Sequence, residues 1–377
     1  MNFSFAEEQN LLRDSVQKFV QDEYEFEKRR QLVHSQENFS NAHWRTFAEL
    51  GWLSLPFDES LGGFGGTIID SIILMEEFGK GLVVEPFLVN VGLAGPLLSR
   101  LGPVEKVGDY IQKLIAGELQ LALAVHEPHI GSDFAKTCTS ATLNGDHYLL
   151  SGEKTYVLNG ADADYLLVVA RTSGQTGDRS GIDVFLVDAN SPGLNKTTFK
   201  TIDGHYGVRL QLDQVAVDAG HRLGESGQAL SALEFVINEA IVLLCAEAVG
   251  AMESLYTKTV EYCKTRKQFG LPIGKFQVLQ HRMADMFMDY EQSKSMLFMA
   301  AIKWRDQTSD AARCVSALKA QIGKAGRLVG QQAVQLHGGI GMTDELDIGH
   351  YFKRVTAIDA LFGNRDYHLQ RMSQLAE

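Results

Sequence analysis

The chain has 377 residues, of which 45% are hydrophobic, 22% are charged and only 7 are prolines. This composition is typical of a globular protein with two or three domains, and it excludes a disordered chain, a collagen and a small disulfide scaffold. The 35 Lys and Arg residues are outnumbered by 47 Asp and Glu residues, and the net charge of -12 argues against broad electrostatic binding of nucleic acid or anionic lipid. The 4 cysteines form no CxxC pair, so neither a disulfide framework nor a metal site is predicted.

The sequence also lacks the pattern of a secretion signal. Glu7, Glu8 and Asp14 interrupt the apolar pattern of the first 20 residues. The two most apolar stretches, 82–98 and 241–252, contain charged residues or prolines and fall short of the roughly 20 apolar residues that a membrane span needs. We therefore expect a cytoplasmic protein with no membrane span.

Residues 1–118 are predicted to form an α-helical domain. Apolar residues recur at helical spacing near both of its ends, for example Val16 with Val20 and Ile68 with Ile72. The glycine-rich segment LGGFGG, residues 61–66, lies between helical segments. It is either a simple connector or a loop that faces a ligand.

Residues 119–225 are predicted to form a β domain. Short runs such as DYLLVVAR and GIDVFLVD are rich in β-branched residues, and turn residues such as Asn144-Gly145-Asp146 separate them. No helical pattern of 10 to 15 residues is interleaved with these runs, which favours an antiparallel sandwich or barrel over a βαβ array.

Residues 226–377 are predicted to form a helical bundle. Long amphipathic patterns continue through this region, with breaks at 269–274 and 306–310, which is typical of antiparallel helices. The predicted order is α, β, α, and the fold class is α+β, with a helical N-terminal domain, an antiparallel central domain and a C-terminal four-helix bundle.

Common nucleotide and hydrolase motifs are missing from the sequence. The segment GGIGMTD at 338–344 lacks the third glycine of a dinucleotide fingerprint, and no P-loop, HExxH, GxSxG or kinase signature is present. A nucleotide, if one binds, must use another scaffold.

Two segments in the β domain stand out. HEPHIGSD, residues 126–133, places Gly131 and Ser132 in a turn whose N–H groups can face an anion or a ring carbonyl, although an ordinary turn would explain it equally. GEKTYVLNG, residues 152–160, places Tyr156 on a short strand, where it is either a ligand contact or the core tyrosine of a hairpin.

Two further segments lie in the helical bundle. KTRKQFGLPIGKFQ, residues 264–277, is locally basic, and its Arg266 can bind a phosphate unless the segment is only a solvated helix end. QLHGGIGM, residues 335–342, ends a helix on a glycine pair that permits close backbone approach, with Gln335 available to a polar ring, although a helix stop alone would also explain it.

Taken in order, these four segments resemble the acyl-CoA dehydrogenase family over essentially the whole chain. The resemblance implies FAD bound between the β domain and the bundle, a tetramer, and removal of two hydrogens from Cα and Cβ of an acyl-CoA thioester. It also implies that an electron-transfer flavoprotein accepts the electrons.

The resemblance assigns residues to FAD segment by segment. HEPHIGSD resembles T-E-P-x-x-G-S-D, with His126 and Ser132 beside the flavin, and GEKTYVLNG resembles G-x-K-x-W-I-T-N, with Tyr156 and Leu158 there. TRKQFG resembles R-x-x-F-G, which is expected to reach the FAD of a neighbouring subunit, and QLHGGIG resembles Q-x-x-G-G-x-G. The other residues assigned to FAD are Arg266, Gln268, Phe269, Gln335, Gly338, Gly339 and Asn364.

The catalytic base of the family is not found at either of its usual positions. The segment ALFGNRD, residues 360–366, places Phe362 where the family has Glu, and the alternative position is occupied by Ala240. Glu239 is one residue away and is the best local candidate, although a neighbouring residue on a helix points about 100° away.

Three readings of the function follow from this resemblance. The first is an FAD-dependent acyl-CoA dehydrogenase, and the second is an FAD-binding subunit, non-catalytic or half-site, of a heterotetramer with a second dehydrogenase-like chain. The third is another FAD-dependent acyl-CoA enzyme of the same fold. Segments such as IVLLCAEAVGAM and YFKRVTAIDALFG resemble the pimeloyl-CoA dehydrogenase small-subunit group, so fatty, dicarboxylic and sterol side-chain thioesters all remain open as substrates.

Overall fold

The computed structural model describes residues 5–35 and 37–375. The chain divides into two compact units. We call residues 1–34, 67–83 and 241–377 the helical unit, and residues 35–66 and 84–240 the sheet unit. Each unit combines segments that are far apart in the sequence. The predicted boundaries at 118 and 225 follow the change of secondary structure and remain a prediction.

The sheet unit combines short helices with most of the strands. Its α-helices are α3 (Asn41–Glu49), α5 (Phe87–Val89), α6 (Gly95–Leu101), α7 (Val104–Ile115) and the first part of α8 (Ala229–Thr265). Its strands are β1 (Leu121–Ala124), β2 (Ser140–Asn144), β3 (His147–Leu158), β4 (Tyr165–Arg171), β5 (Ile182–Asp188), β6 (Leu194–Lys200), β7 (Tyr206–Asp218) and β8 (Arg222–Leu223). The sequence analysis did not identify β6 or β8.

The eight strands form a mixed sheet. Their order is β6-β7-β3-β2-β4-β5-β8, with β1 paired to β4. The predicted antiparallel pairing is confirmed for most of the sheet, and the exceptions are β1 and β2, which both pair with β4 in parallel. Parallel pairing needs a long connection between the strands, and residues 125–164, which carry HEPHIGSD and GEKTYVLNG, supply the connection from β1 to β4.

Burial along the strands matches their positions in the sheet. Strand β4 is buried at nearly every residue, whereas β7 alternates between buried and exposed residues over much of its length. Alternation is typical of a strand with one face in the core. The core includes Leu150, Phe185 and Leu210.

The segment LGGFGG is a tightly packed connector. The N–H of Gly65 donates to the carbonyl of Phe57 at 2.8 Å, and the N–H of Gly66 donates to the carbonyl of Leu55 at 2.8 Å. A Cβ on Gly63 would lie 2.0 Å from the carbonyl oxygen of Phe57. This close backbone packing accounts for the glycine and favours the connector over a loop that faces a ligand.

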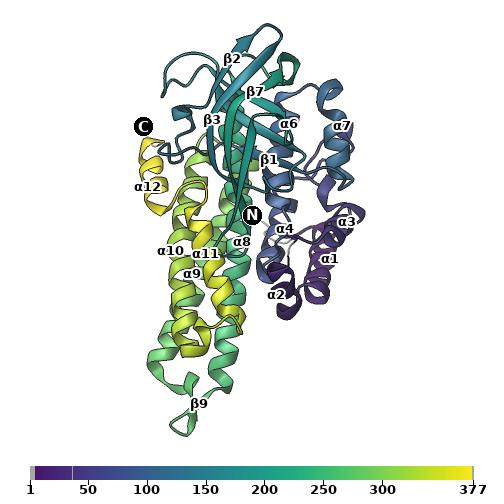
Figure 1. The fold of residues 1–377 in the computed structure, drawn as a ribbon. Coiled ribbons are helices and arrows are strands. Elements are labelled where there is room, and N and C mark those ends of the chain that lie inside the picture. Colours follow the sequence, from purple (N-terminus) through teal and green to yellow (C-terminus); the bar gives the residue numbers. More distant parts are fainter. Residues whose placement is uncertain (1–4, 36, 376–377) are drawn as a thin grey trace. The chain divides into compact units, whose positions relative to one another are not determined.

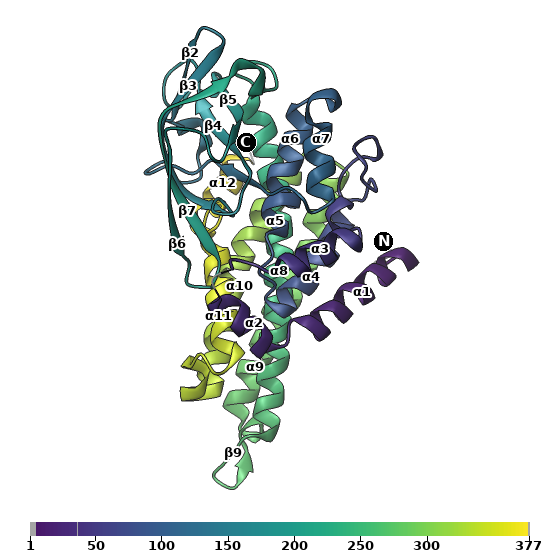
Figure 2. The same cartoon turned by 45° about the vertical axis from the view of Figure 1, so that its right-hand side comes forward.

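The helical unit contains α1 (Glu7–Glu23), α2 (Phe26–His34), α4 (Ile68–Gly81), the rest of α8, α9 (Gln277–Arg305), α10 (Ala311–His337), α11 (Asp347–Ala360) and α12 (Arg365–Gln374). Its long helices α8, α9 and α10 lie side by side in both Figure 1 and Figure 2. The strands β9 (Lys267–Gln268) and β10 (Leu271–Pro272) form a hairpin that projects beyond α8 and α9 in both views. The predicted helical bundle is confirmed.

Helix α8 is also long and apolar enough to span a membrane. Among the described residues it is the one helix that passes this test, but 72% of its most apolar window is buried inside the protein. Glu247 lies in the same helix, and its carboxylate accepts two hydrogen bonds from Arg354 of α11, at 2.5 and 2.7 Å. These features are those of a buried core helix.

Helices α4 and α8 touch through their backbones at two glycines. A Cβ on Gly79 would lie 1.9 Å from the carbonyl oxygen of Glu247, and a Cβ on Gly250 would lie 1.8 Å from that of Glu76. No side chain fits at either position, so the glycines set the distance between the two helices.

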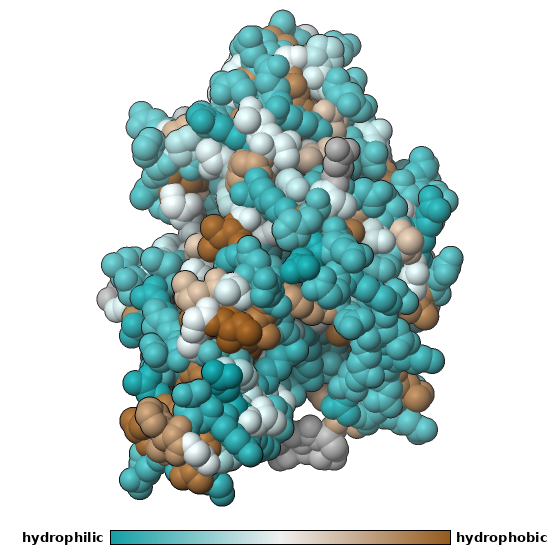
Figure 3. Space-filling view, turned by 60° about the horizontal axis from the view of Figure 1, so that its bottom comes forward, coloured by the Kyte–Doolittle hydropathy of each residue, from teal (hydrophilic) through white to brown (hydrophobic). Residues whose placement is uncertain are grey.

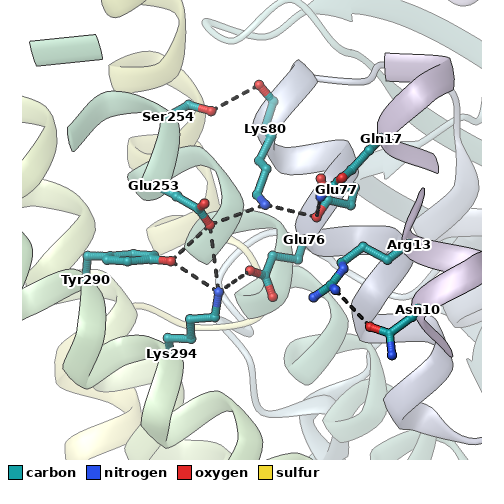
Figure 4. Close-up of polar contacts among 10 residues, drawn as sticks. All are labelled: Asn10, Arg13, Gln17, Glu76, Glu77, Lys80, Glu253, Ser254, Tyr290 and Lys294. Carbon is teal, nitrogen blue, oxygen red and sulfur yellow. Dashed lines mark hydrogen bonds and ion pairs between the residues drawn. The ribbon is translucent and has the colours of Figure 1, made fainter. Parts of the chain in front are cut away.

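Charged side chains surround this crossing (Figure 4). Lys294 of α9 pairs with Glu76 of α4 at 2.8 Å, and Lys80 of α4 lies 3.4 Å from Glu253 of α8. The hydroxyl of Tyr290 also donates to Glu253, at 2.9 Å. This network connects α4 with both α8 and α9.

We predict that Gly250→Ala lowers the free energy of unfolding by about 1–3 kcal/mol, because the new methyl group forces α4 and α8 apart. The measurement is chemical denaturation, with Gly108→Ala in α7 as the control. The nearest atom to a Cβ on Gly108 is 3.8 Å away, so the control should be neutral or gain up to about 1 kcal/mol from better helix propensity. Equal effects of the two substitutions would contradict the prediction.

Candidate active site

The segment HEPHIGSD forms an irregular turn after β1. His129 and Gly131 have positive φ angles of 69° and 58°, and a Cβ on Gly131 would meet no atom within 4 Å. Ser132 is half-buried beside this open position. The predicted turn is confirmed, while the role of Ser132 in cofactor binding stays a prediction.

A buried ion pair joins this segment to GEKTYVLNG. The Nζ atom of Lys154 lies 2.6 Å from the carboxylate of Glu127, which also accepts the N–H groups of Cys138 at 2.7 Å and Thr139 at 3.0 Å. Burial opposes the charge of Glu127, but the attraction of Lys154 and these hydrogen bonds lower the pKa of the carboxyl group. Burial lowers the pKa of Lys154.

This pair holds two predicted flavin contacts near each other. His126 precedes Glu127, and the carbonyl of His126 accepts the N–H of Thr155 at 2.8 Å. Tyr156 follows directly. The sequence analysis missed both Glu127 and Lys154, although both lie inside the motifs that carry the resemblance.

The His126 side chain is neutral at physiological pH. Burial lowers its pKa to about 4, and its ring packs edge-on against Phe134, with the ring centroids 5.6 Å apart. An uncharged imidazole can donate from one nitrogen and accept at the other. His126 can therefore make a directional hydrogen bond without introducing charge.

Tyr156 lies near the end of a long strand, not on a separate short one. Strand β3 runs unbroken from His147 to Leu158, and its register against β7 shifts between Lys154 and Val157. Tyr156 has a positive φ of 54° at this irregularity, and its ring centroid is 5.8 Å from that of Phe199. The ring is half-buried, and its contact with the flavin stays a prediction. Leu158 is half-buried and packs against the core of the sheet.

Arg171 holds the turn that follows HEPHIGSD. Its guanidinium donates to the main-chain carbonyls of Ala135, Thr137, Ser173, Asp178 and Ser180. From sequence, Arg171 looks like a charged strand end, so nothing in the local pattern could have identified this role.

In the helical unit, two cavities lie along α10 and share Gln331 and Gln332. The larger, of about 650 Å³, is lined by the predicted residues Gln335, Gly338 and Gly339. The smaller, of about 340 Å³, is lined by the predicted residue Asn364. We call the two cavities together the α10 groove. It brings together four predicted residues from two separate segments.

The α10 groove also contains cations that the sequence analysis missed. They are Arg282, Lys324, Arg327 and Arg365. Residues 324, 327, 331 and 335 follow each other at intervals of three and four along α10, which places them on one helix face. This spacing was visible in the sequence and could have revealed that these polar side chains share one face of α10.

The glycine pair at the end of α10 leaves room for an external group. Gly338 has φ 68° and ψ -146°, a conformation that favours glycine, and it ends the helix as predicted. A Cβ on Gly338 or Gly339 would meet nothing within 4 Å, so no packing inside the chain requires glycine at 339. Open backbone, amide side chains and several cations suit the hydroxyl groups and phosphates of a dinucleotide such as FAD.

The segment around Arg266 forms the β9–β10 hairpin. Phe269 and Gly270 at its tip have positive φ angles of 52° and 80°, and Phe269 is 90% exposed. Arg266 and Gln268 are also exposed, and none of these residues lines the α10 groove. Figure 3, with the hairpin end turned forward, shows hydrophobic patches on a mostly hydrophilic surface. The segment is thus an exposed hairpin beside the end of α8, and the contact of Arg266 with a phosphate stays a prediction.

The candidate base Glu239 is half-buried in the sheet unit. Burial raises its pKa, and the charge of Arg100 opposes this shift. The guanidinium of Arg100 stacks 3.8 Å above the ring of Phe235. Ala240 is fully buried. Phe362 is 5% exposed, with φ 56°.

Within residues 5–35 and 37–375, no group of three His, Cys, Asp or Glu side chains could hold a metal ion.

We predict that Glu127→Gln lowers the free energy of unfolding by about 3–5 kcal/mol, because it leaves the buried ammonium of Lys154 without its counter-charge. The control is Glu153→Gln, which breaks the neighbouring pair with the exposed Arg209 and should change little. Thermal denaturation of both variants tests this. A control as unstable as Glu127→Gln would show that the loss is not specific to the buried pair.

Comparison with known proteins places this site in a family. The acyl-CoA dehydrogenase N-terminal, middle and C-terminal domains match residues 6–118, 122–215 and 231–376. The chain is 28% identical to the short-chain specific acyl-CoA dehydrogenase of Clostridium acetobutylicum over 92% of both chains.

Solved structures are similar over nearly the whole chain. The ChsE4-ChsE5 complex from Mycobacterium tuberculosis matches with a TM-score of 0.90 and 28% identity, covering 100% of this chain and 99% of that one. The FAD complex of PigA matches with a TM-score of 0.90 and 25% identity, covering 99% and 98%. The chain therefore belongs to the acyl-CoA dehydrogenase family and is an FAD-dependent oxidoreductase.

Proposed function

We propose that this chain is the FAD-binding subunit of a heteromeric acyl-CoA dehydrogenase and that a second dehydrogenase-like chain supplies the catalytic base. The observation that carries the proposal is Phe362, a buried side chain at the position where the family has Glu. A phenyl ring cannot accept a proton, and neither can Ala240 at the alternative position. The ChsE4-ChsE5 structure is a complex of two different proteins, which supports the heteromer.

In this proposal, the HEPHIGSD turn binds a flavin ring, and the α10 groove binds the phosphates of an FAD. Bound FAD supplies the acceptor for the two electrons that leave the acyl chain. Lys324, Arg327 and Arg365 offset phosphate charge, and the main chain at Gly338 and Gly339 allows close approach. His126, Ser132 and Tyr156 border the flavin ring. Leu158 offers the ring an apolar contact and no hydroxyl donor.

A self-sufficient dehydrogenase that uses Glu239 is the second candidate. Its support is the pKa of Glu239, which burial raises. A carboxylate with a raised pKa is a stronger base near neutral pH than an exposed one. The nearby charge of Arg100 weakens this advantage, and we favour the heteromer.

We also propose an assembly through the β9–β10 hairpin. Phe269 is 90% exposed and held at a positive φ, a conformation that costs on the order of 1–3 kcal/mol in a residue other than glycine. Contact with another subunit would bury this ring and place Arg266 near the FAD bound there. The assembly is a tetramer, the acceptor is an electron-transfer flavoprotein and the location is the cytoplasm.

The function is tested by anaerobic flavin bleaching with a panel of fatty, dicarboxylic and sterol side-chain acyl-CoA thioesters. We expect slow bleaching by the single chain and bleaching at least about 100-fold faster by Phe362→Glu, because a positioned base contributes roughly 10²–10⁴-fold. Glu234→Gln, on the same helix as Glu239 but paired with the exposed Arg179, is the control for Glu239→Gln.

Three results would separate the candidates. Rapid bleaching by the wild type that Glu239→Gln abolishes, with Glu234→Gln unaffected, would refute the heteromer and identify Glu239 as the base. Rapid bleaching by the wild type and by both the Glu239→Gln and Glu234→Gln variants would exclude both candidates. Slow bleaching that increases only with a second chain would support the heteromer.

The assembly is tested by light scattering together with the measured FAD content. We expect Phe269→Ser to yield smaller particles with less FAD. Arg266→Ala should weaken FAD binding by on the order of 1.5–3 kcal/mol, the value of one hydrogen bond to a charged group. Leu143→Ser removes an apolar side chain of the sheet unit that is 57% exposed, and it should change neither measurement. A stable, FAD-loaded monomer of the wild type would refute the assembly.

A further inference from the structure

The side chain of Lys319 on α10 is fully buried and ends at the main chain of a turn. Its exposed fraction is 0%, and its Nζ atom donates to the carbonyl oxygens of Asp359 at 2.9 Å and Gly363 at 2.8 Å. The carbonyl of Asp359 lies in the last turn of α11, and that of Gly363 lies near the far end of the turn that connects α11 to α12. One side chain therefore bridges the whole turn.

The turn has an unusual backbone conformation. Phe362 and Gly363 both have positive φ, 56° and 101°. A phenylalanine in this region is strained and persists only when its surroundings enforce it. A Cβ on Gly363 would lie 2.3 Å from the ring of Tyr367, so the main chain is also packed closely at this point.

Other groups act together with Lys319. The Nε2 atom of the buried His368 lies 3.1 Å from the carbonyl oxygen of Phe362, and burial lowers the pKa of His368 to about 3. The ring is therefore neutral, and its N–H donates to that carbonyl. The carbonyl oxygens of 359, 362 and 363 thus all have a buried donor.

Burying a lysine side chain only to fill space is energetically unfavourable. Desolvation of an ammonium group costs several kcal/mol, and an apolar side chain of the same length would fill the same volume without that cost. Such an apolar side chain could not make the two hydrogen bonds that Lys319 donates to the carbonyl oxygens. Their effect is on the geometry of residues 359–364.

This geometry bears directly on the α10 groove. Asp359 and Asn364, at the two ends of the turn, both line the smaller cavity of the groove. Phe362 between them occupies the position that the family resemblance assigns to the base. We propose that Lys319 is a positioning residue, which fixes the turn so that position 362 and the groove wall at Asn364 keep one arrangement.

The expected effect of Lys319 on FAD binding rests on the proposed function, in which the α10 groove binds FAD. The effect of Lys319 on the conformation of the turn does not depend on that function. The first measurement is hydrogen exchange of the purified chain by mass spectrometry. We expect Lys319→Met to accelerate exchange of the amides at 361–364 at least tenfold and to leave the buried strand β4 unchanged. Lys353→Met, a substitution on the exposed side of α11, is the control and should leave the turn protected.

The second measurement is FAD affinity, followed by the visible absorbance and circular dichroism of the flavin. We expect affinity to fall at least threefold in Lys319→Met and to be unchanged in Lys353→Met. If Lys319→Met does not fold, Lys319→Gln takes its place, because its shorter amide cannot reach both carbonyls.

Unchanged exchange at 361–364, or a uniform increase over the whole chain, would overturn the proposal. Faster exchange with unchanged FAD affinity would overturn the positioning role as well. The exchange result does not depend on FAD, so failure of the wild type to bind FAD would be recognised separately, as a failure of the proposed function.

Discussion

The backbone contact between α4 and α8 is the constraint on which the helical unit depends. At this crossing, the carbonyl oxygen of Glu247 occupies the space that a side chain at Gly79 would need. The carboxylate of the same Glu247 binds the buried Arg354 of α11. Helix α11 leads directly into the turn that carries Phe362. The glycine contact thus connects the N-terminal helices to the candidate site through one residue.

Each unit has a buried lysine beside residues of the candidate site, but the two lysines act by different means. Lys154 meets a carboxylate, so its charge is balanced and the pair joins two segments of the sheet unit. Lys319 meets carbonyl oxygens and orders a turn of the helical unit. Each lysine is fully buried, and each lies next to residues that the family resemblance assigns to the cofactor or to the base.

In the turn at Phe362, the main-chain geometry of the position does not depend on the chemistry of the side chain that occupies it. Its main chain is held by Lys319 and His368, and neither interaction involves the side chain at 362. A phenyl ring can therefore occupy the position without disturbing the hydrogen bonds around it. This arrangement is consistent with a subunit that keeps the cofactor groove and relies on another chain for proton removal.

The sequence by itself determined the order of helices and strands, the helix end at Gly338 and the family. These features depend on local periodicity, glycine and motif order, all of which can be read along the chain. Parallel pairing of β1 and β2 with β4 could not be predicted, because it depends on contacts between distant strands. Strand β6, in which no residue is fully buried, gave no alternating apolar signal.

The tertiary structure alone decided how the site is held together. Glu127, Arg171 and Lys319 look like ordinary charged residues in the sequence, because burial and partners are set by segments far away in the chain. The cations of the α10 groove could be predicted only in part, because their helical spacing was visible in the sequence but the cavity beside them was not. Charge in the sequence shows that a side chain can bind, and only packing decides whether it meets a carboxylate, a carbonyl or an open groove.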